Sequence, residues 1–270
     1  DCGWHECIFL KKYFDPGYDE LYLQFKVKFE DGFICERCKF PRLGGLLQDS
    51  PAGRCVTGYN DFAAVYEFAA TRGGDVMLKD YVYHVLMWNA TFYRDWYHGV
   101  TGEYPTSCDD VCAITDAGEG GCGVYGEGDW FEPYLQDGQW HTFTQRVVLN
   151  DLGSANGFVE SFVDGRFANR LDGLLFTKTD DLKINNAVLG MYFTRAPPPR
   201  DLRVYFDDVQ IFYFLPDSDQ PVGQERSSSE RVLPDVSCTD CEEDTNPNPL
   251  RPEPTRSEEH TSELQSLLII

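Results

Sequence analysis

The sequence predicts an all-β protein built as a β-jelly-roll sandwich. Residues 21–29 alternate strictly between apolar and polar side chains, the pattern of a strand with one buried face. Further short strand-like segments follow with turn residues between them, and no long helical period interrupts them. Apolar residues make up 42% of the 270 residues, enough for the core of one large domain or two small ones.

The predicted strands follow one another along most of the chain. After residues 21–29, we expect strands at 62–68, 76–88, 140–149, 187–193 and 202–214, and a hairpin at 158–167 that turns at Asp164-Gly165. In the segment 76–88, alternation places Lys79, Tyr81 and Tyr83 on one face of the strand. Those three polar side chains are therefore expected to point in one direction.

Two segments read as loops. Residues 35–45 combine cations, a proline and two glycines, and a cationic loop in a strongly acidic chain is the most site-like stretch of the sequence. Residues 103–128 are rich in cysteine, glycine and aspartate, which favours a loop held by disulfides. The remainder of the chain is interpreted as a scaffold for the cationic loop.

Charge and cysteine content restrict the partners and the compartment. The formal net charge of -22 argues against nucleic acids and anionic membranes as partners. Ten cysteines, an even number, favour disulfides and a secreted, extracellular protein, with the pairing left open. The two C-x-x-C pairs are compatible with zinc, but about 200 residues separate them, so we expect no metal and no cofactor.

The composition changes near residue 216 and divides the chain into three parts. Residues 1–215 form the predicted jelly-roll domain. Residues 216–255 are acidic and rich in Pro and Ser, which predicts a disordered tail, and from Asp217 to the end thirteen acidic residues stand against four basic ones. Residues 256–270 read like the conceptual translation of a sequencing adapter and are excluded from the fold prediction.

Four segments occur in an order that points to a known family. They are the KFPRLGG sequence at 39–45, Tyr81-Val82-Tyr83, the run from Tyr125 through Gly138-Gln139-Trp140 to Gln145-Arg146-Val147-Val148-Leu149-Asn150, and Gly157 to Arg166 followed by Tyr205-Phe206-Asp207-Asp208. Together they resemble the family 14 polysaccharide lyases over roughly residues 15–214. The resemblance implies a concanavalin A-like jelly roll that cleaves a uronic-acid polymer, alginate or glucuronan, by β-elimination.

The resemblance also implies roles for individual residues. Lys39 matches the essential lysine of the family, as base or as neutraliser of the substrate carboxylate, and Tyr81 and Tyr83 match its paired tyrosines. Lyase chemistry needs a base for the C5 proton, an acid for the leaving oxygen and a cation beside the carboxylate. The expected substrate-binding cations are Arg37, Arg42, Arg72 and Lys79.

The sequence departs from the family pattern at several positions, among them Thr194-Arg195 in place of a Gly-Gly pair, and leaves alternatives open. The family strand before the tyrosines usually reads Phe-Ser-x-Arg, where this chain has Ala63 and Val65 in place of the Ser and the Arg. The alternative is therefore a catalytically impaired relative that only binds acidic glycans. A jelly-roll glycoside hydrolase ranks lower, because no compact pair of carboxylates is evident. We expect a monomer with an acidic polysaccharide as its partner.

Overall fold

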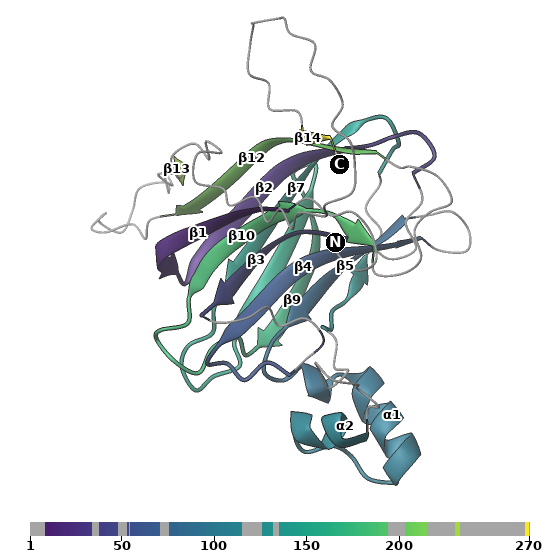
Figure 1. Ribbon diagram of the computed structural model, residues 1–270, viewed down its shortest axis with the longest axis vertical. Helices are drawn as coiled ribbons and strands as arrows, with labels where there is room; N and C mark the ends of the chain where they lie inside the picture. The colour runs from purple at the N-terminus through teal and green to yellow at the C-terminus, as the bar shows by residue number, and fades with distance from the viewer. Residues whose placement is uncertain are drawn as a thin grey trace, which may run out of the picture.

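The computed structural model describes residues 9–33, 38–47, 53, 55–70, 76–114, 126–131, 135–193, 203–214, 230–232 and 268–269. These residues form two antiparallel sheets packed face to face (Figure 1). Sheet A has the order β1 (Phe9–Tyr18), β10 (Ile184–Gly190), β3 (Cys38–Leu46), β4 (Asp61–Ala70), β5 (Val76–Tyr83) and β6 (Trp130–Phe131), and β11 (Tyr192–Phe193) also pairs with β3. The all-β sandwich predicted from the sequence is confirmed.

Sheet B contains the strand from which the fold was predicted. Its order is β13 (Glu230–Val232), β12 (Val204–Phe214), β2 (Glu20–Phe29), β7 (Trp140–Val148), β8 (Gly157–Val163) and β9 (Arg166–Leu174), and β14 (Leu268–Ile269) also pairs with β12. The alternation in β2 buries Leu21, Leu23, Phe25, Val27 and Phe29 and leaves the residues between them partly exposed. The buried face of β2 therefore points toward sheet A.

Aromatic side chains join the two sheets in the core. Phe25 of β2 stacks on Phe143 of β7 with ring centroids 5.6 Å apart. From sheet A, Phe68 meets Phe143 at 5.9 Å and Phe40 meets Phe206 of β12 at 6.3 Å. Such ring contacts stabilise the folded state in addition to the stabilisation that comes from burying the apolar area of the rings. They fix which face of each sheet A strand points inward, and therefore which face is left for a site.

The structure corrects three sequence predictions. The segment 38–46 is strand β3 and no loop, because its proline sits at a register shift between Lys39 and Arg42, where a missing N–H is tolerated. Strand β5 ends at Tyr83 instead of reaching residue 88. Strand β1 was not predicted, because its residues do not alternate between apolar and polar and Pro16-Gly17 reads as a turn.

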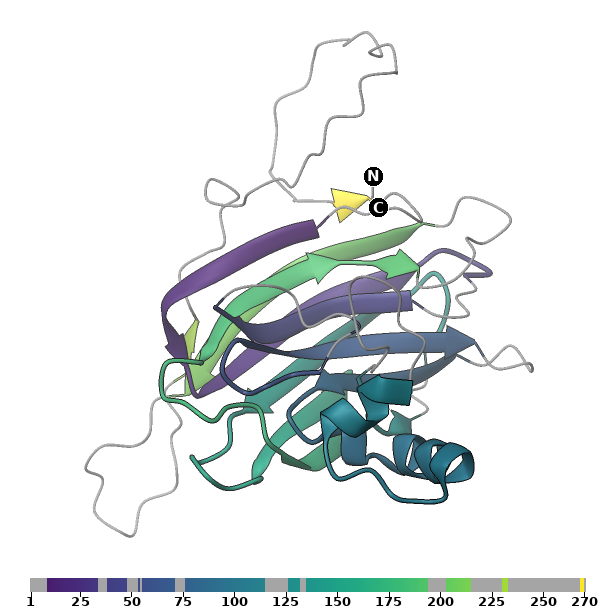
Figure 2. The same ribbon diagram turned by 60° about the horizontal axis from the view of Figure 1, so that its bottom comes forward.

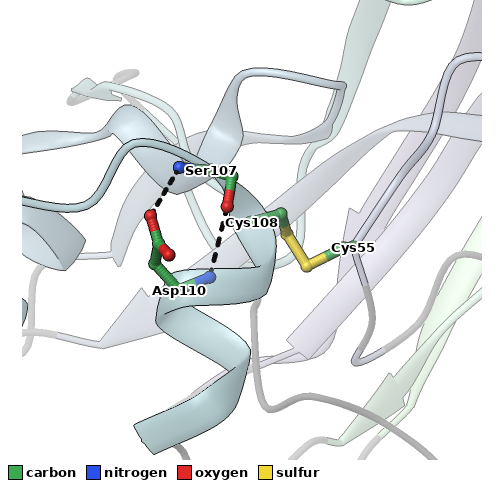
Figure 3. The surroundings of a disulfide bond; sticks show 4 residues. All are labelled: Cys55, Ser107, Cys108 and Asp110. Atoms are coloured by element: carbon green, nitrogen blue, oxygen red, sulfur yellow. Dashed lines mark hydrogen bonds between the residues drawn. A yellow bond between two sulfur atoms is a disulfide. The ribbon is translucent and has the colours of Figure 1, made fainter.

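Helices were also missed, and they lie at one end of the sandwich (Figures 1 and 2). A 3₁₀ turn at Met87–Asn89 leads into α1 (Thr91–Thr101), which ends at Gly102 in the left-handed conformation. Helix α2 (Cys108–Ile114) begins with reciprocal hydrogen bonds (Figure 3), in which the Ser107 N–H donates to Asp110 and the Asp110 N–H donates to the Ser107 hydroxyl. The cap of α2 satisfies backbone N–H groups that the first turn of a helix otherwise leaves without a partner.

A disulfide attaches the helices to the sandwich. Cys55, in the segment that precedes β4, is bonded to Cys108 at the start of α2 across 53 positions of sequence (Figure 3). The prediction that the 103–128 region is held by a disulfide is confirmed at this bond, although part of that region is helical.

Little of the predicted tail belongs to the described part of the chain. Of the tail from residue 216 onward, including the adapter-like residues 256–270, the structure describes Glu230–Val232 and Leu268–Ile269, and the predictions for the rest lie outside the described residues.

Among the described residues, no helix has both the length and the apolar character needed to cross a membrane.

Candidate functional site

The candidate site is on the face of sheet A that points away from the core. In β5 the buried Leu78 and Val82 face inward, so Lys79, Tyr81 and Tyr83 lie on the opposite face, as predicted. Strand register then sets their neighbours in two rows across three strands. Tyr81 is opposite Val65, and Val65 is opposite Arg42, whereas Tyr83 is opposite Ala63, and Ala63 is opposite Gly44.

A third row contains three charged residues side by side. Lys39 of β3 is paired with Glu67 of β4, and Glu67 is paired with Lys79 of β5. The register shift between Lys39 and Arg42 allows both residues of β3 to face the site side. The sheet therefore brings together Lys39, Arg42, Lys79 and both tyrosines.

The lysine and the two tyrosines are in direct contact. The Nζ atom of Lys39 lies 3.9 Å from the ring centroid of Tyr81 and 5.6 Å from that of Tyr83. The two tyrosine hydroxyl oxygens are 3.3 Å apart, and the rings meet edge to face. Lys79 approaches the Tyr81 ring from the same strand, at 5.4 Å. A cation held over an aromatic ring in a partly dry site is attracted by the electron-rich face of the ring.

Glycines allow backbone segments to come close to this cluster. A side chain at Gly126 would place its Cβ 2.7 Å from the Tyr81 ring, and one at Gly44 would lie 2.8 Å from the carbonyl oxygen of Phe62. The segment around Gly126 pairs with β5 through a bridge between Glu127 and Val82. These close approaches leave Lys39 7%, Tyr81 6% and Tyr83 3% exposed.

Burial makes both tyrosines weaker acids, and their hydrogen bonds differ. Burial, and then the charge of neighbouring groups, raises the pKa of Tyr81, and the hydrogen bond with Tyr83 raises it further. Burial also raises the pKa of Tyr83, but the same bond lowers it, as do backbone N–H groups of Gly53 and Gly126. The Gly53 N–H donates to the Tyr83 oxygen at 3.5 Å. A negative charge on the pair is therefore better supported on Tyr83 than on Tyr81.

Sequence reasoning missed Glu67. Its carboxylate is in the site row between Lys39 and Lys79, the residue is only 6% exposed, and its charge contributes to raising the pKa of both tyrosines. The sequence contained a signal for Glu67: strand alternation places Ala63, Val65 and Glu67 on one face of the strand, and Glu67 is the charged residue of the three. We add Glu67 to the candidate site.

The remaining predicted site residues divide into two groups. Arg42 and Lys79 are on the site face: Arg42 is separated from Tyr81 by Val65 in the same row, and Lys79 contacts the Tyr81 ring. Arg37 and Arg72 lie outside the described residues. Two histidines outside the predicted set hold loops: His84 contacts Glu127, and His141 hydrogen-bonds Asp164 at the 164–165 turn.

Comparison with known proteins places the fold. The family model described as Polysaccharide lyase 14 matches residues 80–209, which include both tyrosines and exclude Lys39. An alginate lyase from Chlorella virus has a TM-score of 0.50 at 13% identity, with 76% of this chain and 83% of that chain covered. A mutant of the alginate lyase Aly36B with bound alginate tetrasaccharide has a TM-score of 0.50 at 14% identity, covering 72% and 69%. At these identities the two structures show a shared fold. No match was found among the curated proteins.

Proposed function

Because this chain belongs to polysaccharide lyase family 14 by the match over residues 80–209, we propose that it cleaves a uronic-acid polymer by β-elimination. The observation that carries the proposal is the contact of Lys39 with the hydrogen-bonded pair of Tyr81 and Tyr83 on one face of sheet A. The cluster joins a cation, a proton donor and a proton acceptor, which are the three groups that the reaction needs.

The reaction has a defined balance of bonds and protons. The base takes the proton from C5, the electron pair of the C5–H bond forms a C4–C5 double bond, and the C4–O bond breaks. The leaving oxygen takes a proton from the acid. Since the carboxylate on C5 must accept charge as the proton leaves, a cation beside it lowers the barrier. We assign that cation to Lys39, whose Nζ is over the Tyr81 ring.

The hydrogen bonds support different roles for the two tyrosines. Backbone N–H groups and the hydrogen bond with Tyr81 lower the pKa of Tyr83 against the effect of burial, so a phenolate formed there is stabilised, and we assign Tyr83 as the base. Tyr81 keeps its proton more firmly and is assigned as the acid for the leaving oxygen. Both groups are within hydrogen-bond reach of each other, so one proton can pass between them after the elimination.

Arg42 is proposed as the second cation of the site. The family arginine is replaced here by Val65, and Arg42 is the direct cross-strand neighbour of Val65, which in turn pairs with Tyr81. An arginine on the next strand reaches the same side of the sheet, and its planar guanidinium is suited to a carboxylate. This placement favours an active enzyme over a relative that has lost its cation.

Alginate and glucuronan are the proposed substrates, and the protein is proposed to be secreted. The solved structures that share the fold include alginate lyases, one of them with bound alginate. The Cys55–Cys108 disulfide is consistent with an oxidising compartment.

A panel of polymers tests the proposal. The full chain, expressed under oxidising conditions, is incubated with alginate, polymannuronate, polyguluronate and glucuronan while the ultraviolet absorbance of the unsaturated product is followed. We expect a rise with at least one polymer that is lost in Lys39→Ala and kept in Lys178→Ala, an exposed lysine outside the site. No rise with any polymer, from folded protein that binds one of them, would favour the binding relative suggested by Ala63 and Val65.

A further inference from the structure

A second group of aromatic and cationic residues is on the opposite side of the sandwich, on the outer face of sheet B. Tyr205 of β12, Lys28 of β2 and Trp140 of β7 are register neighbours in one row. Their three strands lie side by side in sheet B (Figure 1). Their sequence neighbours Phe206, Val27 and His141 are buried, so the three side chains of the row point away from the core. We call Tyr205, Lys28 and Trp140 the outer row.

The lysine of the outer row is held by rings rather than by a carboxylate. Its Nζ is 4.9 Å from the centroid of Tyr205 and 5.1 Å from that of Trp140. Among the described residues Lys28 has no ion pair, whereas Lys26, two positions earlier on the same face, pairs with Asp208 at 2.9 Å. An unneutralised cation is notable in a chain with a net charge of -22, because carboxylates are abundant.

The row also presents apolar area to solvent. Trp140 is 38% exposed. Covering the exposed part of its indole ring with a ligand is favourable, because apolar surface is then removed from water. Tyr205 and Lys28 are partly exposed beside it. A flat ring next to a positive charge matches a ligand with an apolar face and a carboxylate at its edge.

We propose that the outer row is a second carbohydrate-binding site, separate from the tyrosine cluster, that takes one uronate unit of an acidic polysaccharide. The sugar ring stacks its C–H face on Trp140, and Lys28 pairs with the carboxylate while Tyr205 holds the lysine from the other side. The class of ligand rests on the proposed function, and the site itself rests on the outer row. The two sites face opposite ways, so one chain can hold polymer at one and cleave it at the other.

The test observes the outer row directly. Protein with isotope-labelled tryptophan and the Lys39→Ala change, which stops cleavage, is titrated with alginate and glucuronan tetrasaccharides and with a neutral β-glucan tetrasaccharide. The indole N–H signal of Trp140 is assigned by Trp140→Phe. We expect this signal to move with at least one uronate and to stay with the neutral sugar.

Matched variants separate charge from folding. Adding Lys28→Gln should lower the affinity measured from the Trp140 signal by about tenfold, which is the size of one aromatic or ionic contact. Lys26→Gln should leave it unchanged, because Lys26 is paired with Asp208. The proposal would be overturned if no uronate moved the Trp140 signal, or if Lys28→Gln left the affinity measured from that signal unchanged.

Cleavage reports on the other site. Lys28→Gln in the otherwise wild-type chain should degrade the tetrasaccharide at the wild-type rate. If the wild-type chain cleaves normally but the Trp140 signal of the Lys39→Ala protein does not shift, the outer site alone is refuted. If the Trp140 signal of the Lys39→Ala protein shifts but the wild-type chain cleaves no polymer, the proposed lyase is refuted and the outer site stays in place.

Discussion

The amino group of Lys39 rests 3.9 Å from the ring centroid of Tyr81, and this contact joins β3 to β5 across the whole width of β4. The two residues are 42 positions apart in the sequence, and only the strand order places them together. Tyr83 completes the cluster through its hydroxyl, 3.3 Å from that of Tyr81. The account of function depends on this arrangement.

Removing either hydroxyl should stop the reaction without unfolding the protein. We expect Tyr81→Phe and Tyr83→Phe each to lower kcat by about 100-fold to 10,000-fold, the usual contribution of a positioned proton donor or acceptor. Tyr13→Phe, at an exposed tyrosine of β1, serves as the control. Near wild-type turnover in Tyr83→Phe would show that another group takes the proton.

Glu67 should set the pH dependence of the tyrosines. Its negative charge raises the pKa of Tyr81 and of Tyr83, so the neutral Glu67→Gln side chain should let both phenols ionise at lower pH. Because the proposed base must lose its proton, the rising limb of kcat/KM against pH should move to lower pH. A limb that stays in place, or moves to higher pH, would contradict the assignment of a tyrosine as base.

Asp80 should make folding stability fall as the pH rises. Burial raises the pKa of this core-facing carboxyl from 3.8 to about 6, against the opposing hydrogen bonds from Ser161 and Asn169. The folded protein thus binds this proton more tightly than the unfolded chain. The resulting stabilisation is complete below the unfolded pKa and is lost as the pH rises through about 6.

Denaturant titrations between acidic and neutral pH measure the effect. Relative to Asp80→Asn, the free energy of unfolding of the wild type should fall by about 3 kcal/mol over this interval, because one pKa unit corresponds to about 1.4 kcal/mol. Asp181→Asn, at an exposed aspartate, should follow the wild-type curve. Parallel curves for wild type and Asp80→Asn would disprove the raised pKa.

The Cys55–Cys108 bond should contribute measurably to stability. It closes a loop across 53 positions of sequence, and chain entropy alone predicts a loss of about 4 kcal/mol in unfolding free energy when the bond is removed. The double variant Cys55→Ser/Cys108→Ser leaves the other cysteines in place, so it is preferable to reduction. Unchanged unfolding would mean that the helices are held by packing alone.

The sequence was sufficient for the fold class and for part of the site. Strict alternation in residues 21–29 gave the buried face of β2, and alternation in β5 put Lys79, Tyr81 and Tyr83 on one face. What alternation does not contain is the order of strands. The neighbourhood of Arg42, Val65 and Tyr81 emerges only from the β3-β4-β5 pairing, which depends on long-range packing.

The misses have local physical causes. Pro41 and the glycines after it have the composition of a loop, yet the chain uses the proline at a register shift and the glycines for close approach to Phe62. Helix α1 is short and aromatic, and it is stabilised by contacts such as that of the buried Tyr93 with the core, so its intrinsic helix signal is weak.

The most direct test of the central claim is the mass of the products that the wild-type chain releases from the polymer it cleaves. In each β-elimination at the Lys39, Tyr81 and Tyr83 cluster, the fragment with the new non-reducing end should be unsaturated at that end and one water lighter than its hydrolysis counterpart. A product mixture that contains saturated fragments alone, with none one water lighter, would contradict the account, because it requires water as a reactant and no abstraction of the C5 proton.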